Sequence, residues 1–426
     1  MKMESLMNDK PLLYPEAIKR VQIDLQRALT DWDFLSGVSG DGPIREFEKW
    51  FAGVAGGKFA IAMPNATSAL FVALMASGIG KGDEVILPAY TWPQTLTPVL
   101  LTGATAVFAD IDADTVTISP ESVKRLISGK TKAIIGVHLF GIPADVIALE
   151  KIARDNGCIL IYDAAQGFGA FYNETSMNHG PQRTTKIYSP KLIPPPLTGG
   201  GQGEGGLRGF SNEQPIGAHG DYVAYSFGRS KLFSIGEGGA LVCQNRELYE
   251  RAIAFSQHPL RMHGDVDDPD MRTLIDGVSM NFRIHPLVAS LALGQLRGLL
   301  DSGKLVRLKV KFKELYSTLD STELRHLLPA IPEGACPSGA CIPLLIKTEE
   351  ALVQSKYILK ALGIDTFEGG IHTPLHLTET IQRHQFLWNW KTGNAVIPFD
   401  KTHTPGSCPN TEERCKICPQ LFIKTA

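Results

Sequence analysis

The alternation of short apolar runs with helix-like stretches constrains the fold of this chain more than any other feature. The apolar runs lie at 58–63, 83–89, 105–111, 131–141 and 158–165. The helix-like stretches lie at 66–78, 95–103, 119–129 and 145–157. Because the apolar runs are hydrophobic at nearly every position rather than at every second one, we expect strands covered on both faces. The pattern predicts an α/β fold with a mostly parallel sheet wound with helices.

Two changes of pattern divide the rest of the chain. Residues 173–219 are rich in Gly, Pro and polar side chains, which is typical of a lid, a binding loop or a disordered insertion. Residues 285–321 form one long helical region, with or without a kink. With 426 residues the chain exceeds the usual size of one hydrophobic core. We therefore expect a large domain at 1–255 and a smaller C-terminal α/β domain at 256–426.

Composition argues against several kinds of partner. Lys and Arg number 42 against 44 Asp and Glu, and a net charge of −2 favours neither nucleic acid nor a membrane surface. The sequence has no transmembrane-length apolar run and no apolar core near its first residue, so a cytoplasmic protein is expected. Its seven cysteines are expected to be reduced. Cys415 and Cys418 have zinc-like spacing but lack a matching second pair, and we predict no metal site.

A lone lysine, Lys231, stands between two apolar runs at 222–227 and 240–243, beside a glycine-rich stretch at 236–239. A lysine in this position raises the question of what chemistry it serves. Glycines let the backbone come close to a ligand or to another strand. Three further sites, each at the end of a strand-like run, bear on the answer, because such sheets bind ligands beyond the carboxyl ends of their strands.

The first of these sites is "MPNATSAL", at 63–70, where a strand passes into a helix. Asn65, Thr67 and Ser68 bring hydroxyls and free N–H groups to the start of that helix. Helix N-termini of this kind bind phosphate, although simple N-capping explains the same residues.

The other two sites contain a carboxylate and an aromatic ring. Asp163 follows the apolar strand in "ILIYDAAQGFGA", where a carboxylate is costly unless it has a cationic or hydrogen-bonding partner. Its alternative role is a helix N-cap. Trp92 in "LPAYTWPQTL" lies at a strand end and offers a stacking platform, with a core position as the alternative.

Together these residues match the needs of one cofactor, pyridoxal 5'-phosphate (PLP). PLP needs a lysine for covalent attachment, a carboxylate for its ring nitrogen, a phosphate cup and a flat surface against its ring. Lys231 and Asp163 supply the first two. Thr67 and Ser68, with Ser226, supply the phosphate cup, and Trp92 supplies the ring clamp.

The sequence resembles the DegT/DnrJ/EryC1/StrS family of sugar and cyclitol aminotransferases, which have fold type I and a seven-stranded sheet. The resemblance covers residues 14–172 and 219–300, with weaker traces to 420. Six motifs carry it in the order of the family: "NATSALFVALMASGIGKGDEVILPAYTW", "GATAVFADIDADT", "TKAIIGVHLFGIPAD", "YDAAQGFGA", "SFGRSKLFSIGEGGAL" and "NFR".

The resemblance implies a role for each matching residue. Lys231 is expected to bind the cofactor covalently and to carry the proton of the reaction, and Asp163 to face the pyridine nitrogen. Gln166 is expected to contact the ring 3-oxygen and Trp92 to stack on the ring. The phosphate contacts are expected from Thr67, Ser68 and Ser226 of one subunit. Asn281 in "MNFR" matches the asparagine that reaches the phosphate of the other subunit, which implies a homodimer with shared active sites.

The implied reaction transfers an amino group from an amino acid, glutamate or glutamine, to the ketone of a sugar or cyclitol through pyridoxamine 5'-phosphate (PMP). A PLP- or PMP-dependent sugar dehydratase or deoxygenase is the alternative; some relatives perform that chemistry with histidine in place of the lysine, and Lys231 argues against it. A non-catalytic regulator with this fold is a further alternative. The retention of Lys231, Asp163 and Trp92 argues against the regulator.

The sequence departs from the family's pattern at several positions that bear on substrate identity. The insertion at 173–219 replaces a short hairpin, Arg229 stands where a neutral residue is common, and Ile284 begins an altered stretch after "NFR". Arg229 and Arg261 are candidate substrate residues. We expect either a solvated polar loop at 255–264 or an opening at which both arginines bind a carboxylate or phosphate, since the arginine fork suits both groups.

Overall fold

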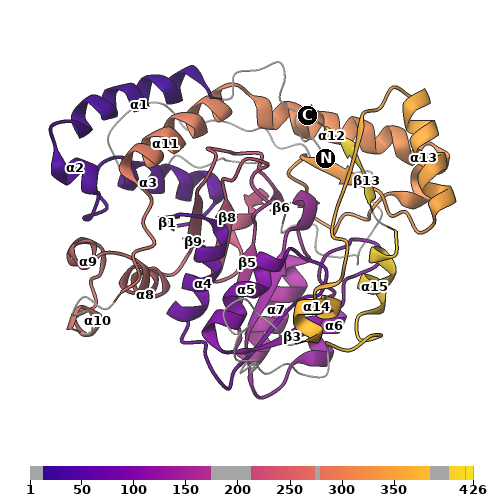
Figure 1. Ribbon diagram of the computed structural model, residues 1–426, viewed down its shortest axis with the longest axis horizontal. Helices are drawn as coiled ribbons and strands as arrows, with labels where there is room; N and C mark the ends of the chain where they lie inside the picture. Colours follow the sequence, from indigo (N-terminus) through magenta and orange to yellow (C-terminus); the bar gives the residue numbers. More distant parts are fainter. Residues whose placement is uncertain (1–12, 174–212, 274–278, 384–402, 418, 426) are drawn as a thin grey trace.

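A computed structural model of the chain describes residues 13–173, 213–273, 279–383, 403–417 and 419–425 (Figure 1). Its centre is a seven-stranded sheet with the strand order β1-β9-β8-β5-β4-β2-β3. The strands are β1 (Phe59–Met63), β2 (Glu84–Pro88), β3 (Thr105–Ala109), β4 (Thr131–Val137), β5 (Ile159–Asp163), β8 (Tyr222–Ser226) and β9 (Gly239–Cys243). Only β9 runs antiparallel to its neighbours in this sheet. The predicted mostly parallel sheet is confirmed.

Both faces of the sheet are covered, because successive side chains of a strand point to opposite faces. In β1, Ala60 and Ala62 belong to one buried hydrophobic cluster, whereas Ile61 and Met63 belong to a second one. The continuous hydrophobicity of the strands therefore reflects two cores separated by one sheet.

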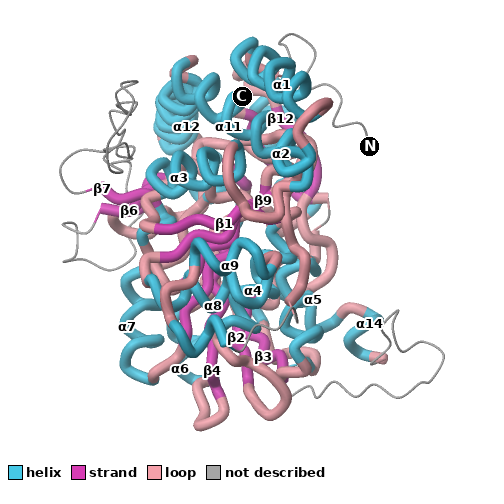
Figure 2. The backbone as a smooth tube through the Cα atoms, turned by 90° about the vertical axis from the view of Figure 1, so that its left-hand side faces the viewer, coloured by secondary structure: helices cyan, strands magenta, loops and turns pink. Residues whose placement is uncertain are grey.

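Helices pack in two layers, one on each side of the seven-stranded sheet (Figure 2). The helices α4 (Ala66–Ala76), α5 (Pro93–Thr102) and α8 (Arg246–Ser256) contribute to one cluster. The helices α3 (Pro43–Ala55), α6 (Pro120–Leu126) and α7 (Val146–Asn156) contribute to the other. The predicted alternation of strands and helices is confirmed over this part of the chain.

The long helical region predicted at 285–321 is two helices, α11 (Pro286–Asp301) and α12 (Lys304–Asp320). Gly303 separates them with a φ of 64°, a left-handed conformation that ends a helix and suits glycine. Helix α1 (Pro15–Ala28) lies along α11 (Figure 1). The contact requires a glycine, because a Cβ atom on Gly294 would lie 2.4 Å from the Cα atom of Ala17.

Two small sheets and several short helices complete the described structure. The sheets have the orders β10-β6-β7 and β11-β13-β12. Their strands are β6 (Phe171–Asn173), β7 (Glu213–Pro215), β10 (Ala335–Cys336), β11 (Cys341–Pro343), β12 (Thr366–Gly369) and β13 (Gln420–Lys424). The remaining α-helices are α2 (Trp32–Ser36), α9 (Pro259–Asp265), α10 (Pro269–Thr273), α13 (Glu349–Ala361), α14 (Glu379–Gln382) and α15 (Pro409–Cys415). The 3-10 helices are Leu139–Gly141, Ile216–Ala218, Glu323–Leu327 and Leu375–Leu377.

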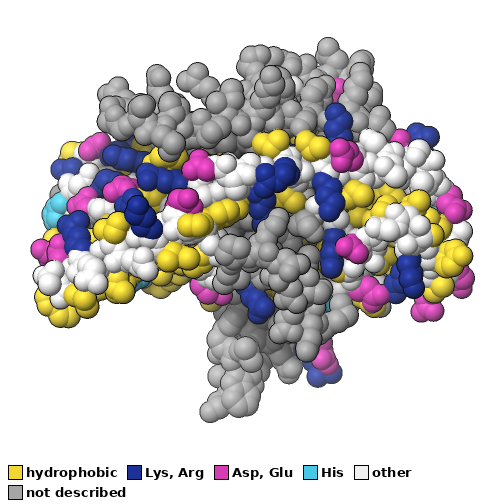
Figure 3. Space-filling model, turned by 90° about the horizontal axis from the view of Figure 1, so that it is seen from above, with side chains coloured by type: hydrophobic (Ala, Val, Ile, Leu, Met, Phe, Trp, Pro, Cys, Tyr) yellow, Lys and Arg dark blue, Asp and Glu magenta, His cyan; other side chains and the backbone are white. Residues whose placement is uncertain are grey.

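The end of β6 and the whole of β7 lie within the insertion predicted at 173–219, and residues 174–212 of it lie outside the described residues. The helix α1 from the predicted large domain packs on α11 from the predicted small domain, and the division at 255 and 256 stays a prediction. Within the described ranges, no helix is long and apolar enough to cross a membrane, and no disulfide joins the six cysteines found there. On the face seen in Figure 3, Lys and Arg side chains are interspersed with acidic and apolar ones.

Candidate active site

Asp163 is the last residue of β5, at the carboxyl end of the sheet. Its side chain is buried, with the residue 7% exposed, and it accepts hydrogen bonds from the Thr95 hydroxyl at 2.8 Å and from the Ala165 backbone N–H at 3.0 Å. Burial raises the pKa of Asp163, and the charge of Lys231 opposes that rise. No ion pair to Asp163 is present in the part of the chain that the structure describes. The carboxylate therefore has room for one more positively charged hydrogen-bond donor.

Lys231 lies in the turn between β8 and β9, and its backbone N–H donates to the Gly228 carbonyl at 3.0 Å. A bridge between Gly228 and Gly236 closes the base of this turn. The side chain is half-buried, and burial lowers the pKa of Lys231 while the charge of Asp163 raises it. Asp163 pairs in register with Ala224 on the neighbouring strand β8, so the turn that carries Lys231 begins beside the carboxylate, and the charge of each group acts on the pKa of the other.

The N-terminus of α4 lies beside the end of β8. Asn65 caps this helix, with its Oδ1 accepting from the Ser68 N–H at 2.9 Å, so the capping interpretation holds for these two residues. In the part of the chain that the structure describes, the Thr67 hydroxyl makes no hydrogen bond, which leaves it available to a ligand. Ser226 is paired in register with Gly239, and a Cβ atom on Gly239 would lie 2.6 Å from the Asn65 carbonyl carbon. This close approach brings Ser226 next to the helix N-terminus.

Trp92 directly precedes α5 and is 61% exposed, so the alternative of a core position is wrong. Its ring is available for stacking, because Trp92 precedes α5 and the first buried residue of that helix is Thr95. Gln166 is exposed and its Oε1 accepts from the Phe140 N–H at 2.6 Å, which fixes the side chain three residues beyond Asp163. Trp92 directly precedes the helix whose Thr95 bonds to Asp163, and Gln166 follows Asp163 by three residues.

Arg229 and Asn281 are both exposed. Arg229 lies in the same turn as Lys231, two residues earlier. Asn281 makes no side-chain hydrogen bond in the described ranges of the chain, whereas the backbone N–H groups of its neighbours Met280 and Phe282 bond to the end of α8. The asparagine is therefore presented outward from a fixed backbone, and which subunit it serves stays a prediction.

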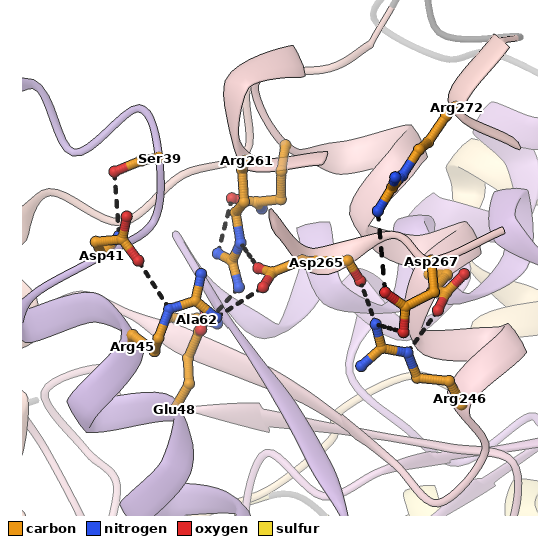
Figure 4. Close-up of polar contacts among 12 residues, drawn as sticks. Ser39, Asp41, Arg45, Glu48, Ala62, Arg246, Arg261, Asp265, Asp267 and Arg272 are labelled. Atoms are coloured by element: carbon orange, nitrogen blue, oxygen red, sulfur yellow. Dashed lines mark hydrogen bonds and ion pairs between the residues drawn. The ribbon is translucent and has the colours of Figure 1, made fainter. Parts of the chain in front are cut away.

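The expectation that Arg261 either lies in a solvated loop or lines an opening for substrate is wrong. Residues Pro259–Asp265 form helix α9, and Arg261 is 1% exposed. Its guanidinium donates to Glu48 Oε2 at 2.7 Å and to Asp265 Oδ2 at 2.8 Å (Figure 4). Two buried carboxylates satisfy this arginine, so it holds no charge free for a substrate.

Sequence reasoning missed Thr95 and the partner of Arg261. Thr95 could have been identified from the sequence, because it lies three positions after Trp92 in the same motif and on the first turn of the helix that follows. Glu48 could not have been identified as the partner of Arg261, because it lies 213 positions away in the sequence. A charged residue inside an amphipathic helix gives no local signal that it is buried.

These residues fit PLP. A buried carboxylate without an ion-pair partner in the described residues suits a protonated ring nitrogen, and a helix N-terminus with an available threonine hydroxyl suits a phosphate. A half-buried lysine whose pKa is lowered is a better nucleophile than an exposed one. The exposed ring of Trp92 offers a surface for stacking. Within the described ranges, no group of three or more His, Cys, Asp or Glu side chains could hold a metal ion.

Comparison with known proteins identifies the family of the chain. The profile of the DegT/DnrJ/EryC1/StrS aminotransferase family matches residues 36–415. The chain belongs to this family, as the six motifs indicated. Family membership also confirms the expectation of a PLP cofactor.

Two of the curated relatives are named for polysaccharide biosynthesis and for GDP-perosamine synthesis. The spore coat polysaccharide biosynthesis protein SpsC of Bacillus subtilis (strain 168) is 31% identical over 307 residues, which cover 69% of this chain and 64% of the relative. The GDP-perosamine synthase of Escherichia coli O157:H7 is 29% identical over 253 residues, which cover 59% and 57% respectively. The match thus spans less than two thirds of the length of either relative.

Solved structures share the fold over nearly the whole chain. DesV of S. venezuelae superposes with a TM-score of 0.64 at 25% identity, covering 97% of this chain and 92% of DesV. The E. coli GDP-4-keto-6-deoxy-D-mannose-3-dehydratase, solved with hydrated PLP, superposes with a TM-score of 0.67 at 19% identity, covering 98% and 96%. The fold alone is therefore common to an aminotransferase family and to a dehydratase. It confirms the expected fold type and leaves the reaction open.

Proposed function

We propose that this protein is a PLP-dependent aminotransferase. It takes an amino group from an amino acid, glutamate or glutamine, and delivers it to the ketone of a sugar or cyclitol. The observation that carries the proposal is the position of the half-buried Lys231 in the turn after β8, the strand that pairs with β5 at the buried Asp163. The cofactor, when bound, supplies an electron sink for the carbanion at the substrate's α-carbon.

The side chains of the chain divide the remaining work. Asp163 keeps a positive charge on the nitrogen that it faces, because a carboxylate in a dry site favours the protonated form of its partner strongly. Thr95 holds the carboxylate in place through its 2.8 Å hydrogen bond. Lys231 accepts a proton at Nζ from one carbon and returns it to another, a task that suits an amine whose pKa burial has lowered.

The phosphate is held by Thr67, Ser68 and Ser226, and Asn281 is donated from the partner subunit. A homodimer with shared sites is therefore part of the proposal, supported by the outward position of Asn281 on a fixed backbone. Gln166 contacts the ring 3-oxygen and Trp92 covers one face of the ring. The proposed setting is the cytoplasm.

Absorbance spectroscopy of the two half-reactions tests the proposal. The holoprotein is mixed with glutamate or glutamine singly, and conversion of the lysine-bound PLP band to the PMP band is followed. Keto sugars are then screened for the reverse change. Conversion by a donor followed by reversal with a keto sugar supports an aminotransferase. Loss of a hydroxyl from a keto sugar without return of the PLP band would instead indicate the dehydratase reaction, and the absence of any cofactor band that Lys231→Ala removes would overturn both.

A further inference from the structure

A buried chain of contacts connects the exposed Asn281 to the phosphate-binding end of α4. Its first link is backbone bonding between the segment 279–282 and the C-terminal end of α8. The Met280 N–H donates to the Phe255 carbonyl at 2.8 Å, and the Phe282 N–H donates to the Ser256 carbonyl at 2.9 Å. The residue between these two bonds, Asn281, is held on both sides while its side chain stays exposed.

Gln257 joins this segment to Arg261. Its amide Nε2 donates to the Phe282 carbonyl at 3.1 Å, and its Oε1 accepts from Arg261 NH1 at 3.3 Å. Gln257 is buried, so a neighbouring water does not replace these bonds when they are lost. A hydroxyl bond from Ser279 to the Gln257 carbonyl at 2.7 Å adds a third contact.

Arg261 then links α9 to α3 and to the sheet. Its NH2 donates to Glu48 Oε2 at 2.7 Å, and Glu48 Oε1 accepts from the Ala62 N–H at 2.8 Å. Ala62 lies on β1, an edge strand of the central sheet, three residues before the cap of α4 at Asn65. Both charged groups are buried, at 1% exposed for Arg261 and 5% for Glu48.

The surroundings make this link rigid (Figure 4). Asp265 bonds to Arg261 at 2.8 Å and to Arg45 at 2.7 Å, and the adjacent carboxylates keep the pKa of Arg261 above its usual range despite burial. Gly40 closes over the arginine, since a Cβ atom on it would lie 2.7 Å from Arg261 Cδ. A guanidinium fixed by three partners in a dry site has one geometry, whereas a surface ion pair has many.

We infer that Gln257 and the Arg261–Glu48 pair are positioning residues that set the place of Asn281 relative to the α4 N-terminus. The inference rests on the proposed function, in which α4 binds the phosphate of one subunit's cofactor and Asn281 binds the phosphate of the partner's. Because Glu48 and Gln257 bond to different nitrogens of the same guanidinium, the network couples the two phosphate sites of the dimer. A structural ion pair would stabilise the fold without this effect.

The test is a double-mutant cycle on the binding of PMP to the full-length apoprotein. Asn281→Ala is expected to weaken PMP binding about tenfold to hundredfold, the value of one or more hydrogen bonds to a charged group. Gln257→Ala is expected to weaken it several-fold, and the double variant no more than Asn281→Ala alone, because residues that act through one another are not additive. Gln257→Glu, which keeps the acceptor for Arg261 but loses the donor to Phe282, should behave like Gln257→Ala even if the alanine variant folds poorly.

Two control measurements distinguish a positioning role of these residues from a general loss of folding stability. Pyridoxamine, which lacks the phosphate, should bind the Gln257 variants and the wild type equally. Tyr316→Phe, which removes a buried 2.6 Å hydrogen bond from α12 to the Pro329 carbonyl and touches no member of the connecting chain, should lower the melting temperature and leave the PMP dissociation constant unchanged. Additive effects of Gln257 and Asn281, or an equal loss for pyridoxamine, would overturn the inference and leave the proposed function intact. An Asn281→Ala variant with wild-type PMP affinity would overturn the inference together with the shared-site dimer.

Discussion

The hydroxyl of Thr95 donates a 2.8 Å hydrogen bond to Oδ2 of Asp163, joining the first turn of α5 to the end of β5. The Ala165 N–H holds the other carboxylate oxygen at 3.0 Å. Both oxygens therefore have a donor before any ligand arrives, and the carboxylate plane is fixed. An orienting partner of this kind matters because catalytic geometry tolerates little displacement.

Replacement of Lys231 by alanine is expected to abolish turnover while PLP and PMP still bind. The phosphate contacts, Asp163 and Trp92 do not depend on the lysine, whereas proton transfer between the two carbons does. Steady-state rates and equilibrium binding of PMP check the two halves of this prediction. A Lys231→Ala variant that retains a substantial fraction of the wild-type rate would show that the lysine is assigned wrongly.

Replacement of Thr95 by valine is expected to lower kcat about tenfold, the value of one hydrogen bond to a charged group at its lower end. Valine keeps the shape of threonine, and the loss is therefore that of the hydroxyl. Asp163→Ala is expected to cost several kcal/mol of transition-state stabilisation, as the loss of a charge in a dry site usually does. Single-turnover rates with one donor measure both, and equal rates for Thr95→Val and wild type would refute an orienting role.

Asp163→Asn is expected to stabilise the cofactor-free protein near neutral pH. Burial raises the pKa of Asp163 above its ordinary value near 3.8, so the folded state binds a proton more tightly than the unfolded chain. Below a pH of about 3.8 the carboxyl is protonated in both the folded and the unfolded state, so it does not change the free energy of unfolding. As pH rises through it, the unfolded chain ionises first and the folded state loses stability until the folded-state pKa is passed.

Calorimetry of the apoproteins checks the predicted direction of this stability change. The Asp163→Asn apoprotein should melt above the wild type at about pH 7, and the difference should shrink as the pH approaches about 4. With PLP bound the order should reverse, because the wild-type carboxylate then has a cationic partner. A wild-type apoprotein that melts above Asp163→Asn at neutral pH would mean that the carboxylate already has a partner without the cofactor.

Local patterns in the sequence were sufficient for the sheet and for the residues at its carboxyl edge. Continuous hydrophobicity identified β2 to β5. Asp163 ends β5 and Trp92 follows β2, and parallel strands end on one edge of the sheet. The same reasoning failed for Arg261, where the deciding partner, Glu48, lies on another helix. It also failed at Gly303, because a glycine inside a helical pattern is compatible with a continuous helix, a kink or a break.

Arg229 is the remaining candidate of the two arginines expected to bind substrate. Arg229 is exposed and lies in the turn that carries Lys231, so an anionic group of the substrate can reach it without opening the fold. Arg229→Ala is expected to raise the KM of one substrate about tenfold, the lower end for hydrogen bonds to charged groups. A rise in the donor KM in the step that forms PMP would identify the donor carboxylate as its ligand, and a rise confined to the acceptor would identify an acceptor anion.

Arg251→Ala is the matched control for this prediction, because Arg251 is also exposed and pairs with Glu247 on the surface of α8. Loss of the Arg251 side chain should leave the rates of both half-reactions unchanged, because an exposed ion pair contributes little to stability and this pair lies outside the site. Raised ionic strength should reduce the difference between Arg229→Ala and wild type, because salt screens an exposed guanidinium more than a buried one. Half-reactions of Arg229→Ala within about twofold of wild type would place the arginine among the solvated surface residues, since a bonded charge is worth more than that.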